Sequence, residues 1–227
     1  MVSLPVDAST FSSSGCCSKF ICKGCDHANQ RREWEQRLRR TCPFCREPLP
    51  LTREECDKLR MKRVEANDPD ALRFYGVKQY QKGDYRSAFE YFTKAADLGN
   101  AWSHYNLSLL YRDGEGVEKD EGKLIHHLEE AAIGGHPGAR YHLGIHEGGD
   151  ENYERALKHW MIGAAQGCDK SIKMLMNIFK EQKEEVVSKE QLNVALRAHK
   201  AAVDATKSPQ RKTAEEFKKG KKGLRGS

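Results

Sequence analysis

Three similar segments recur along the middle of the chain and constrain its fold more than any other feature. Residues 95–99, 131–135 and 163–167 each combine two adjacent small residues with a closing glycine, and they start 36 and then 32 residues apart. Sequence periods of this length are typical of solenoids in which each repeat is a pair of antiparallel helices. We therefore predict a mostly α fold, with an α-solenoid over residues 70–180.

The helices of the second repeat and the glycine turns of all three repeats can be placed from the sequence. Residues 101–111 and 120–134 have helical periodicity. Glycine-containing turns are predicted between paired helices at Lys82-Gly83, at residues 114–117 and at Gly148-Gly149. A helix within residues 181–206 is expected to cover the open end of the stack, because terminal repeats need a polar outer face.

The segments outside the repeats complete the predicted domain organisation. Residues 1–47 form a cysteine-rich module, and residues 48–69 form a linker helix that begins with the capping box Thr52-x-x-Glu55. Residues 207–227 lack periodicity and are rich in lysine and glycine, so we expect a disordered basic tail.

The cysteines are concentrated near the start of the chain. Six of the eight lie within the first 45 residues, including Cys22-x-x-Cys25 and Cys42-x-x-Cys45, two pairs separated by 16 residues. Each pair can direct two thiolates at one tetrahedral zinc ion, and the spacing between the pairs suits a zinc site. No signal-peptide pattern is present, so we expect an intracellular protein, cytoplasmic or nuclear, in which clustered cysteines bind metal rather than form disulfides.

The cysteine-rich module also resembles a known family. The run from Cys17 to Cys25, followed by Cys42-Pro43-Phe44-Cys45-Arg46, resembles the second half of a RING finger. RING fingers bind two zinc ions in a cross-brace, in which ligand pairs one and three share one ion and pairs two and four share the other. The resemblance implies that Cys17 and position 19 form pair two, Cys22 and Cys25 pair three, and Cys42 and Cys45 pair four.

The sequence departs from the RING pattern at two places. Position 19 is Lys19, whose ammonium group cannot bind zinc, so the adjacent Cys16 is the candidate replacement, with His27 as a second candidate. Residues 1–15 contain no cysteine, so pair one is absent and the finger is N-terminally incomplete. We hypothesise that translation begins upstream of Met1.

The RING resemblance implies a contact with a ubiquitin-conjugating enzyme. In this family an apolar groove beside a basic residue makes that contact, which assigns it here to Ile21, Trp34, Pro43 and Arg46. No catalytic residue is expected, because RING ligases form no covalent intermediate. Three functions stay open: an adaptor whose finger recruits a conjugating enzyme, a RING-type ubiquitin ligase proper, and a scaffold with only a structural zinc knuckle.

The repeats resemble Sel-1-like repeats, which are relatives of tetratricopeptide repeats. The best match is residues 101–135, with Tyr105-Asn106-Leu107-Ser108, Tyr111, Gly114-x-Gly116 and Ala131-Ala132, although Ser108 replaces the usual glycine. The resemblance implies that a protein partner binds on the concave face. Variable positions of the first helices are the candidate contacts: Arg73, His104, Asn106, Arg112, Arg140 and His142. His126 and His127 are expected to be surface residues.

The charge distribution argues against a nucleic-acid-binding body. The net charge of the chain is +6, and the last 21 residues carry eight basic and two acidic side chains, which accounts for all of it. The tail could bind anions through charge alone, but no nucleic-acid partner is expected for the folded body. No run of 18 apolar residues is present, so we expect no membrane insertion.

Overall fold

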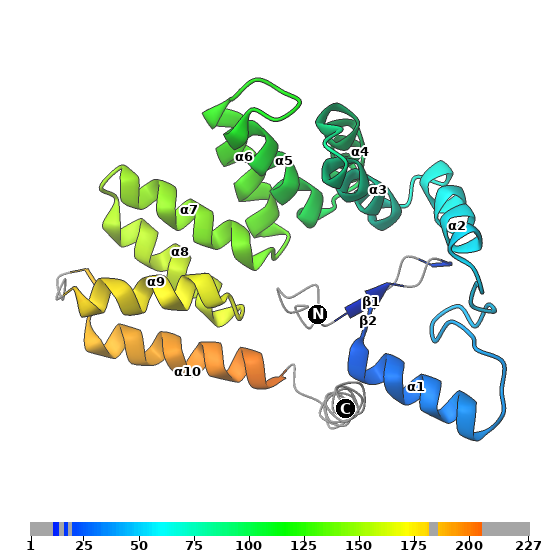
Figure 1. The fold of residues 1–227 in the computed structure, drawn as a ribbon. Helices are drawn as coiled ribbons and strands as arrows, with labels where there is room; N and C mark the ends of the chain where they lie inside the picture. Colours follow the sequence, from blue (N-terminus) through cyan, green and yellow to red (C-terminus); the bar gives the residue numbers. More distant parts are fainter. Residues whose placement is uncertain (1–10, 14–15, 18–19, 182–185, 206–227) are drawn as a thin grey trace, which may run out of the picture. The chain divides into compact units, whose positions relative to one another are not determined.

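The computed structural model describes residues 11–13, 16–17, 20–181 and 186–205 (Figure 1). Two compact units can be distinguished: a finger unit within residues 7–71 and a repeat unit within residues 72–204. The predicted basic tail and position 19 lie outside the described residues. In the part of the chain that is described, no helix is both long and apolar enough to cross a membrane.

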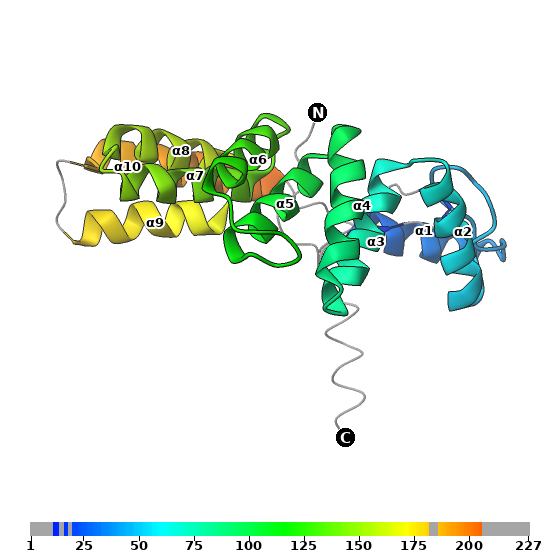
Figure 2. The ribbon, with the colours of Figure 1, turned by 90° about the horizontal axis from the view of Figure 1, so that it is seen from above.

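The repeat unit is a series of paired helices that follow one another along the chain (Figures 1 and 2). α5 packs against α6 and α7 against α8, and each pair contacts its neighbours. The predicted mostly α solenoid is therefore confirmed. Its helices are α3 (Pro69–Gln81), α4 (Tyr85–Asp97), α5 (Ala101–Asp113), α6 (Glu121–Ile133), α7 (Pro137–Gly149), α8 (Tyr153–Ala165), α9 (Asp169–Lys180) and α10 (Lys189–Ala205).

The first helices of the repeats begin at equivalent N-cap positions. Backbone N–H groups at the start of each helix lack partners within the helix, and a polar side chain at the N-cap supplies one. Asp68, Asn100 and His136 each accept a hydrogen bond from the backbone N–H three residues later, at 2.9, 2.9 and 3.2 Å. The fourth equivalent residue, Cys168, makes no such bond. The repeat thus fixes where these helices begin.

Small and large side chains alternate between the paired helices. A Cβ atom added at Gly76 would lie 2.5 Å from the ring of Phe92, and one at Gly144 would lie 2.4 Å from Nε1 of Trp160. The second repeat has Ser108 and Leu128 at the equivalent positions, 32 residues after Gly76 and 36 residues after Phe92. The serine that departs from the family pattern therefore occurs in the repeat whose facing residue is smaller than an aromatic ring.

Two of the three predicted turns are confirmed and one is wrong. Gly83 and Gly114 have left-handed backbone conformations, as the turn predictions require. By contrast, α7 continues through Gly148-Gly149, and the chain turns at Glu151, whose φ is 62°. Neither Gly148 nor Gly149 has a positive φ, and a Cβ atom at Gly148 would make only an ordinary van der Waals contact with the ring of Trp160, at 3.5 Å. Glycine adopts helical as well as left-handed conformations, so the pair does not by itself fix where the turn lies.

The finger unit is a short hairpin followed by two helices. Strands β1 (Phe11–Ser13) and β2 (Phe20–Cys22) pair in antiparallel register, with Ser12 opposite Ile21. α1 (Lys23–Glu35) contacts both strands, and α2 (Arg53–Glu65) follows. The hydroxyl of Thr52 accepts a hydrogen bond from the N–H of Glu55 at 3.1 Å, so the linker helix begins where its cap predicts.

Candidate metal centre and interaction face

Four cysteines of the finger unit converge on one point. Cys16 and Cys17 lie in the connection between the two strands, and Cys42 and Cys45 lie in the turn that follows Thr41. Their four sulfur atoms all lie within 4.8 Å of one another. The Sγ atoms of Cys17 and Cys42 are 3.6 Å apart, and those of Cys45 and Cys16 are 3.4 Å apart.

Backbone hydrogen bonds shape the turn that carries Cys42 and Cys45. The N–H of Cys42 donates to the carbonyl of Glu47 at 2.8 Å, and the N–H of Arg46 donates back to the carbonyl of Cys42 at 2.9 Å. Arg46 has a φ of 60°, which closes the turn. The turn therefore brings both cysteine side chains to the same side without a longer loop.

A buried carboxylate of α1 holds the start of this turn. Glu33 is only 2% exposed, and its Oε1 accepts hydrogen bonds from both the N–H and the hydroxyl of Thr41, each at 3.0 Å. Thr41 directly precedes Cys42, which is fully buried. Glu33 thus connects α1 to the cysteine turn, although no pattern in the sequence distinguishes it from the other charged residues of its helix.

The donor set fits a zinc ion. In a tetrahedral site with Zn–S bonds of about 2.3 Å, neighbouring sulfur atoms lie about 3.8 Å apart, close to the distances found here. Burial, followed by the thiols of Cys45 and Cys42, raises the pKa of the Cys16 thiol well above its ordinary value. A bound dication reverses that effect, because it favours thiolates over thiols. The four residues therefore have the number, type and spacing of ligands for one ion.

The four clustered cysteines differ from the simplest set suggested by the two C-x2-C pairs. Cys25 is exposed on α1 and is not one of the four, and the side chain of Cys22 lies outside the described residues. Cys16 joins the group instead, at the place where the RING resemblance lacks a ligand at position 19. The sequence feature that pointed to Cys16 as a ligand is its position next to Cys17.

The finger unit lacks an apolar core among its described side chains. Between residues 16 and 68, the buried positions among those whose burial is described are Gly24, Glu33 and Cys42. Large apolar side chains in the same stretch are exposed instead: Trp34, Leu38, Phe44 and Leu51. Units of this size that bury little apolar surface usually need a metal or disulfides to fold. The packing of the unit therefore favours a structural role for a bound ion.

Truncation of Glu33 is expected to weaken metal binding without removing a ligand. Glu33→Ala removes both hydrogen bonds to Thr41, and loss of such supporting contacts typically lowers metal affinity by about 10- to 100-fold. Glu33→Gln keeps an acceptor oxygen and is the control, expected to stay close to wild type. Competition with a zinc chelator measures the affinities. Equal affinities for Glu33→Ala and wild type would contradict the role given to Glu33.

The candidate partner contacts predicted on the first helices differ in which neighbouring helix they face. His104 faces α6, where its Nδ1 lies 3.0 Å from Nδ1 of His127, and Arg140 faces α8, 3.5 Å from Nδ1 of His159. Both therefore contact second helices of their repeats. His142 instead contacts the neighbouring first helix, because its Nε2 lies 3.2 Å from the hydroxyl of Tyr105. The expectation that His127 is a surface residue is wrong, because it is half-buried against His104.

Two cationic side chains, Arg112 and Lys170, act electrostatically on His142, which contacts Tyr105. Burial, together with the charges of Arg112 and Lys170, lowers the pKa of His142 to about 4, so its ring is neutral at pH 7. Arg112 also forms two hydrogen bonds to Asp113, at 2.9 and 2.8 Å. We call these four residues of α5, α7 and α9 the Tyr105 patch: Tyr105, Arg112, His142 and Lys170. Tyr105 and Lys170 were not among the predicted contacts.

His136 is expected to make the stability of the repeat unit depend on pH. Its ring stacks on Tyr105 at 4.1 Å, and burial, with the charges of His142 and Arg73, lowers its pKa to about 3. In the unfolded chain the imidazole of His136 binds a proton near pH 6.5. Between pH 6.5 and about 3 the unfolded state therefore holds more protons than the folded state, and the free energy of unfolding decreases as the pH is lowered. His136 alone accounts for about 2 kcal/mol between pH 7 and pH 5.

The variant that tests this dependence is His136→Asn, because Asn100 occupies the equivalent N-cap position. The variant keeps an N-cap acceptor but removes the titrating ring, so its free energy of unfolding should change less between pH 7 and pH 5 than that of wild type. Urea unfolding at both pH values measures the difference. The same pH dependence in both proteins would show that His136 is not responsible.

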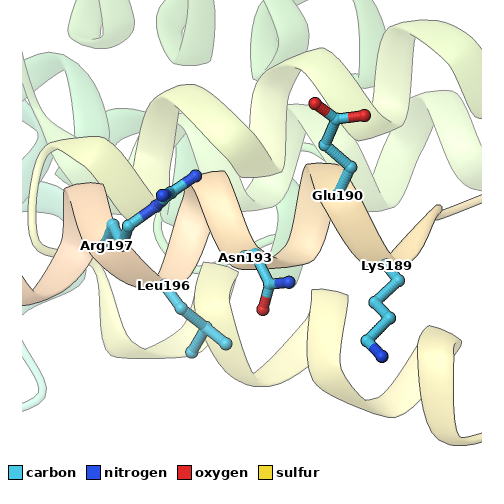
Figure 3. A pocket seen from close by; sticks show the side chains of 5 residues that line it. All are labelled: Lys189, Glu190, Asn193, Leu196 and Arg197. Carbon is cyan, nitrogen blue, oxygen red and sulfur yellow. The ribbon is translucent and has the colours of Figure 1, made fainter.

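The hollow beside α10 does not have the features of an active site. Its volume is about 520 Å³ and its described lining comes from one helix: Lys189, Glu190, Asn193, Leu196 and Arg197. Figure 3 shows Glu190 and Arg197 pointing to the opposite side of the helix from Lys189 and Leu196. Because these side chains diverge, they present no set of polar groups to a common point.

Comparison with known proteins identifies the helix pairs. The Sel1 repeat family matches residues 69–100, 103–136 and 137–168. These residues are three Sel1 repeats. The crystal structure of a Sel1 repeat protein from Oxalobacter formigenes has the same arrangement, with a TM-score of 0.56 and 27% sequence identity, covering 66% of this chain and 64% of that one. The resemblance noted for residues 101–135 is confirmed, and the matched region extends over neighbouring Sel1 repeats on both sides.

Two curated relatives match over shorter stretches. DAP3-binding cell death enhancer 1 of Rattus norvegicus is 40% identical over 55 residues, which is 24% of this chain and 11% of that protein. The putative beta-lactamase HcpC of Helicobacter pylori is 44% identical over 52 residues, which is 23% of this chain and 18% of that protein. The chain thus matches less than a fifth of the length of either relative.

Proposed function

We propose that the chain is a protein-interaction adaptor, in which the Sel1 repeats bind a protein partner and the four clustered cysteines hold one structural zinc ion. The observation that carries the proposal is the Sel1 match itself, because such helical repeats mediate protein–protein interaction. We place the binding site for the partner at the Tyr105 patch, since its residues come from the first helices of three successive repeats. An intracellular location remains part of the proposal.

The chemistry of the Tyr105 patch favours an acidic segment of the partner. Lys170 is exposed, and Arg112 keeps donors beyond those used by Asp113, so both can pair with carboxylates. Tyr105 offers an apolar ring with a hydroxyl at one end, a combination that is enriched at interfaces. Binding through this patch should weaken as the salt concentration rises.

The test is a quantitative pull-down with the full chain and two variants. Reversing the patch charges with Arg112→Glu and Lys170→Glu is expected to deplete the specific partner at least tenfold. The matched control is Lys94→Glu, which reverses an exposed charge on α4, a second helix. Recovery of the same partners at the same levels by all three proteins would contradict binding through the patch.

A RING-like role in ubiquitin transfer is the second candidate, and one observation favours it. The cluster combines Cys17 of pair two with Cys42 and Cys45 of pair four, as a cross-brace requires, and Cys16 would replace the ligand missing at position 19. Trp34, Pro43 and Arg46 are exposed, and Ile21 is half-buried. These residues are the proposed contacts for a ubiquitin-conjugating enzyme.

Discharge of ubiquitin from charged conjugating enzymes separates the ligase from the scaffold. If the finger recruits such an enzyme, the zinc-loaded chain should accelerate discharge to free lysine, and Trp34→Ala or Arg46→Ala should remove the acceleration. The control is Lys58→Ala, an exposed charge on α2. No acceleration across a panel of conjugating enzymes would leave the scaffold with a structural zinc knuckle as the function of the finger.

A further inference from the structure

Two histidines of the second repeat face each other between its paired helices. His104 lies on α5 and His127 on α6, and these two helices are packed side by side (Figure 1). Their Nδ1 atoms are 3.0 Å apart, and both side chains are half-buried. Two imidazoles that bind one zinc ion through bonds of about 2.0 to 2.1 Å have nitrogen atoms about 3.3 Å apart. The pair is therefore already spaced to share one ion.

The other repeats do not place two imidazoles at this position. In the first repeat the equivalent residues are Leu72, 32 residues before His104, and Tyr91, 36 residues before His127. In the third they are Arg140 and His159, where the guanidinium donates to the imidazole at 3.5 Å. These two positions thus hold a leucine and a tyrosine in the first repeat, and a donor and an acceptor in the third. Only in the second of these three repeats do they hold two groups that can both bind a metal.

Charges of both signs act on the pair, with carboxylates acting on both rings and the ammonium group of Lys123 acting on His127. Asp97, at the end of α4, acts electrostatically on both rings, and Glu130 acts on His104. The Tyr111 ring stacks on His127 with centroids 5.6 Å apart and planes 12° apart, which restrains the imidazole. The carbonyl of Ala96 hydrogen-bonds to His104, and a carbonyl partner of this kind orients a metal-binding histidine.

Both imidazoles are available as ligands at neutral pH. Burial lowers the pKa of His104, and burial together with the charges of His104 and His126 lowers the pKa of His127 to about 4. A neutral imidazole has one nitrogen with a free electron pair, as metal binding requires. A single proton can bridge the two Nδ1 atoms in the absence of metal, and it moves to Nε2 of its own ring when an ion takes its place.

We propose that the Nδ1 atoms of His104 and His127 bind one zinc ion, with water completing the coordination shell. Imidazole ligands favour zinc and similar transition-metal ions over magnesium or calcium. The site is separate from the cysteine cluster in ligands and in position along the chain, and it does not depend on the proposed adaptor function. A bound ion would connect the two helices of the second Sel1 repeat.

Zinc titration of the full chain tests the site. The protein is first loaded with zinc, so that its cysteine cluster is filled, and unbound metal is removed by gel filtration. Calorimetric titration with further zinc is then expected to show an additional site in wild type. His104→Gln and His127→Gln should each weaken that site at least tenfold. Thermal unfolding without added zinc checks that both variants are folded.

The control is His159→Gln, because His159 occupies the position of His127 in the third repeat but faces an arginine, which cannot bind a metal. This variant is expected to take up the additional zinc as wild type does. Added zinc should also raise the thermal midpoint of wild type and of the control, but not of the other two variants. The proposal is overturned if wild type binds no additional zinc, or if either glutamine variant of the pair binds it as tightly.

Discussion

Removal of zinc is expected to unfold the finger unit and to leave the repeat helices folded. The described side chains of this unit bury Glu33 and Cys42 but no large apolar residue, so packing supplies little stability. In zinc-finger peptides the binding of a structural zinc ion contributes about 10–16 kcal/mol at pH 7, and this binding energy is folding energy. Cys42→Ser should act as chelation does, because Cys42 is a fully buried member of the cluster.

Hydrogen exchange monitored by mass spectrometry distinguishes the two units. Peptides from residues 20–50 should lose their protection in Cys42→Ser or after chelation, whereas peptides from residues 85–205 should keep theirs. Cys56→Ser is the matched control, since Cys56 is a cysteine of α2 outside the cluster. Unchanged protection of residues 20–50 in Cys42→Ser would contradict a metal-dependent finger.

Replacing the pair Gly144 and Trp160 by serine and leucine is expected to show that the two positions are strongly coupled in their effect on stability. Gly144→Ser places a Cβ atom where Nε1 of Trp160 now lies 2.4 Å away, so the ring must move, at a cost of about 2–3 kcal/mol. Trp160→Leu leaves a cavity and costs about 2–4 kcal/mol. The double variant reproduces the Ser108 and Leu128 of the second repeat, so the serine no longer meets an indole ring.

The double-mutant cycle gives the test of this packing. The double variant should be more stable than the sum of the single effects predicts, by about 1–3 kcal/mol, as measured by urea unfolding. Control substitutions at Gly149, where an added Cβ atom meets nothing within 4 Å, should cost less than those at Gly144. Additivity within about 0.5 kcal/mol would show that the two positions do not share one packing constraint.

The repeat architecture could be predicted from the sequence because the same kinds of residue recur at equivalent positions in successive repeats. Small residues recur at the close approaches, and equivalent N-caps recur at Asp68, Asn100 and His136. The turn predicted at Gly148-Gly149 is wrong because glycine adopts both helical and left-handed conformations. Here α7 continues through both glycines, and the residue with a left-handed conformation is Glu151.

The site residues were harder to predict because they depend on contacts between elements. A helical position such as 104 can face a neighbouring first helix or the second helix of its own repeat, and only packing decides which. Similarly, nothing in the order of residues indicates that Glu33 supports Thr41 across the finger unit. Cysteine spacing gave the chemistry of the metal centre, but the choice between Cys16 and Cys25 as ligands needs the three-dimensional arrangement.

X-ray absorption at the zinc edge of the purified full chain tests the central claim most directly. If Cys16, Cys17, Cys42 and Cys45 hold one ion, the tightly bound zinc should show four sulfur neighbours at about 2.3 Å, with one zinc per chain after gel filtration. Cys42→Ser should lose this zinc, and Cys56→Ser should keep it. A chain that holds no zinc, or zinc bound only by nitrogen and oxygen, would contradict the cysteine cluster as a metal centre.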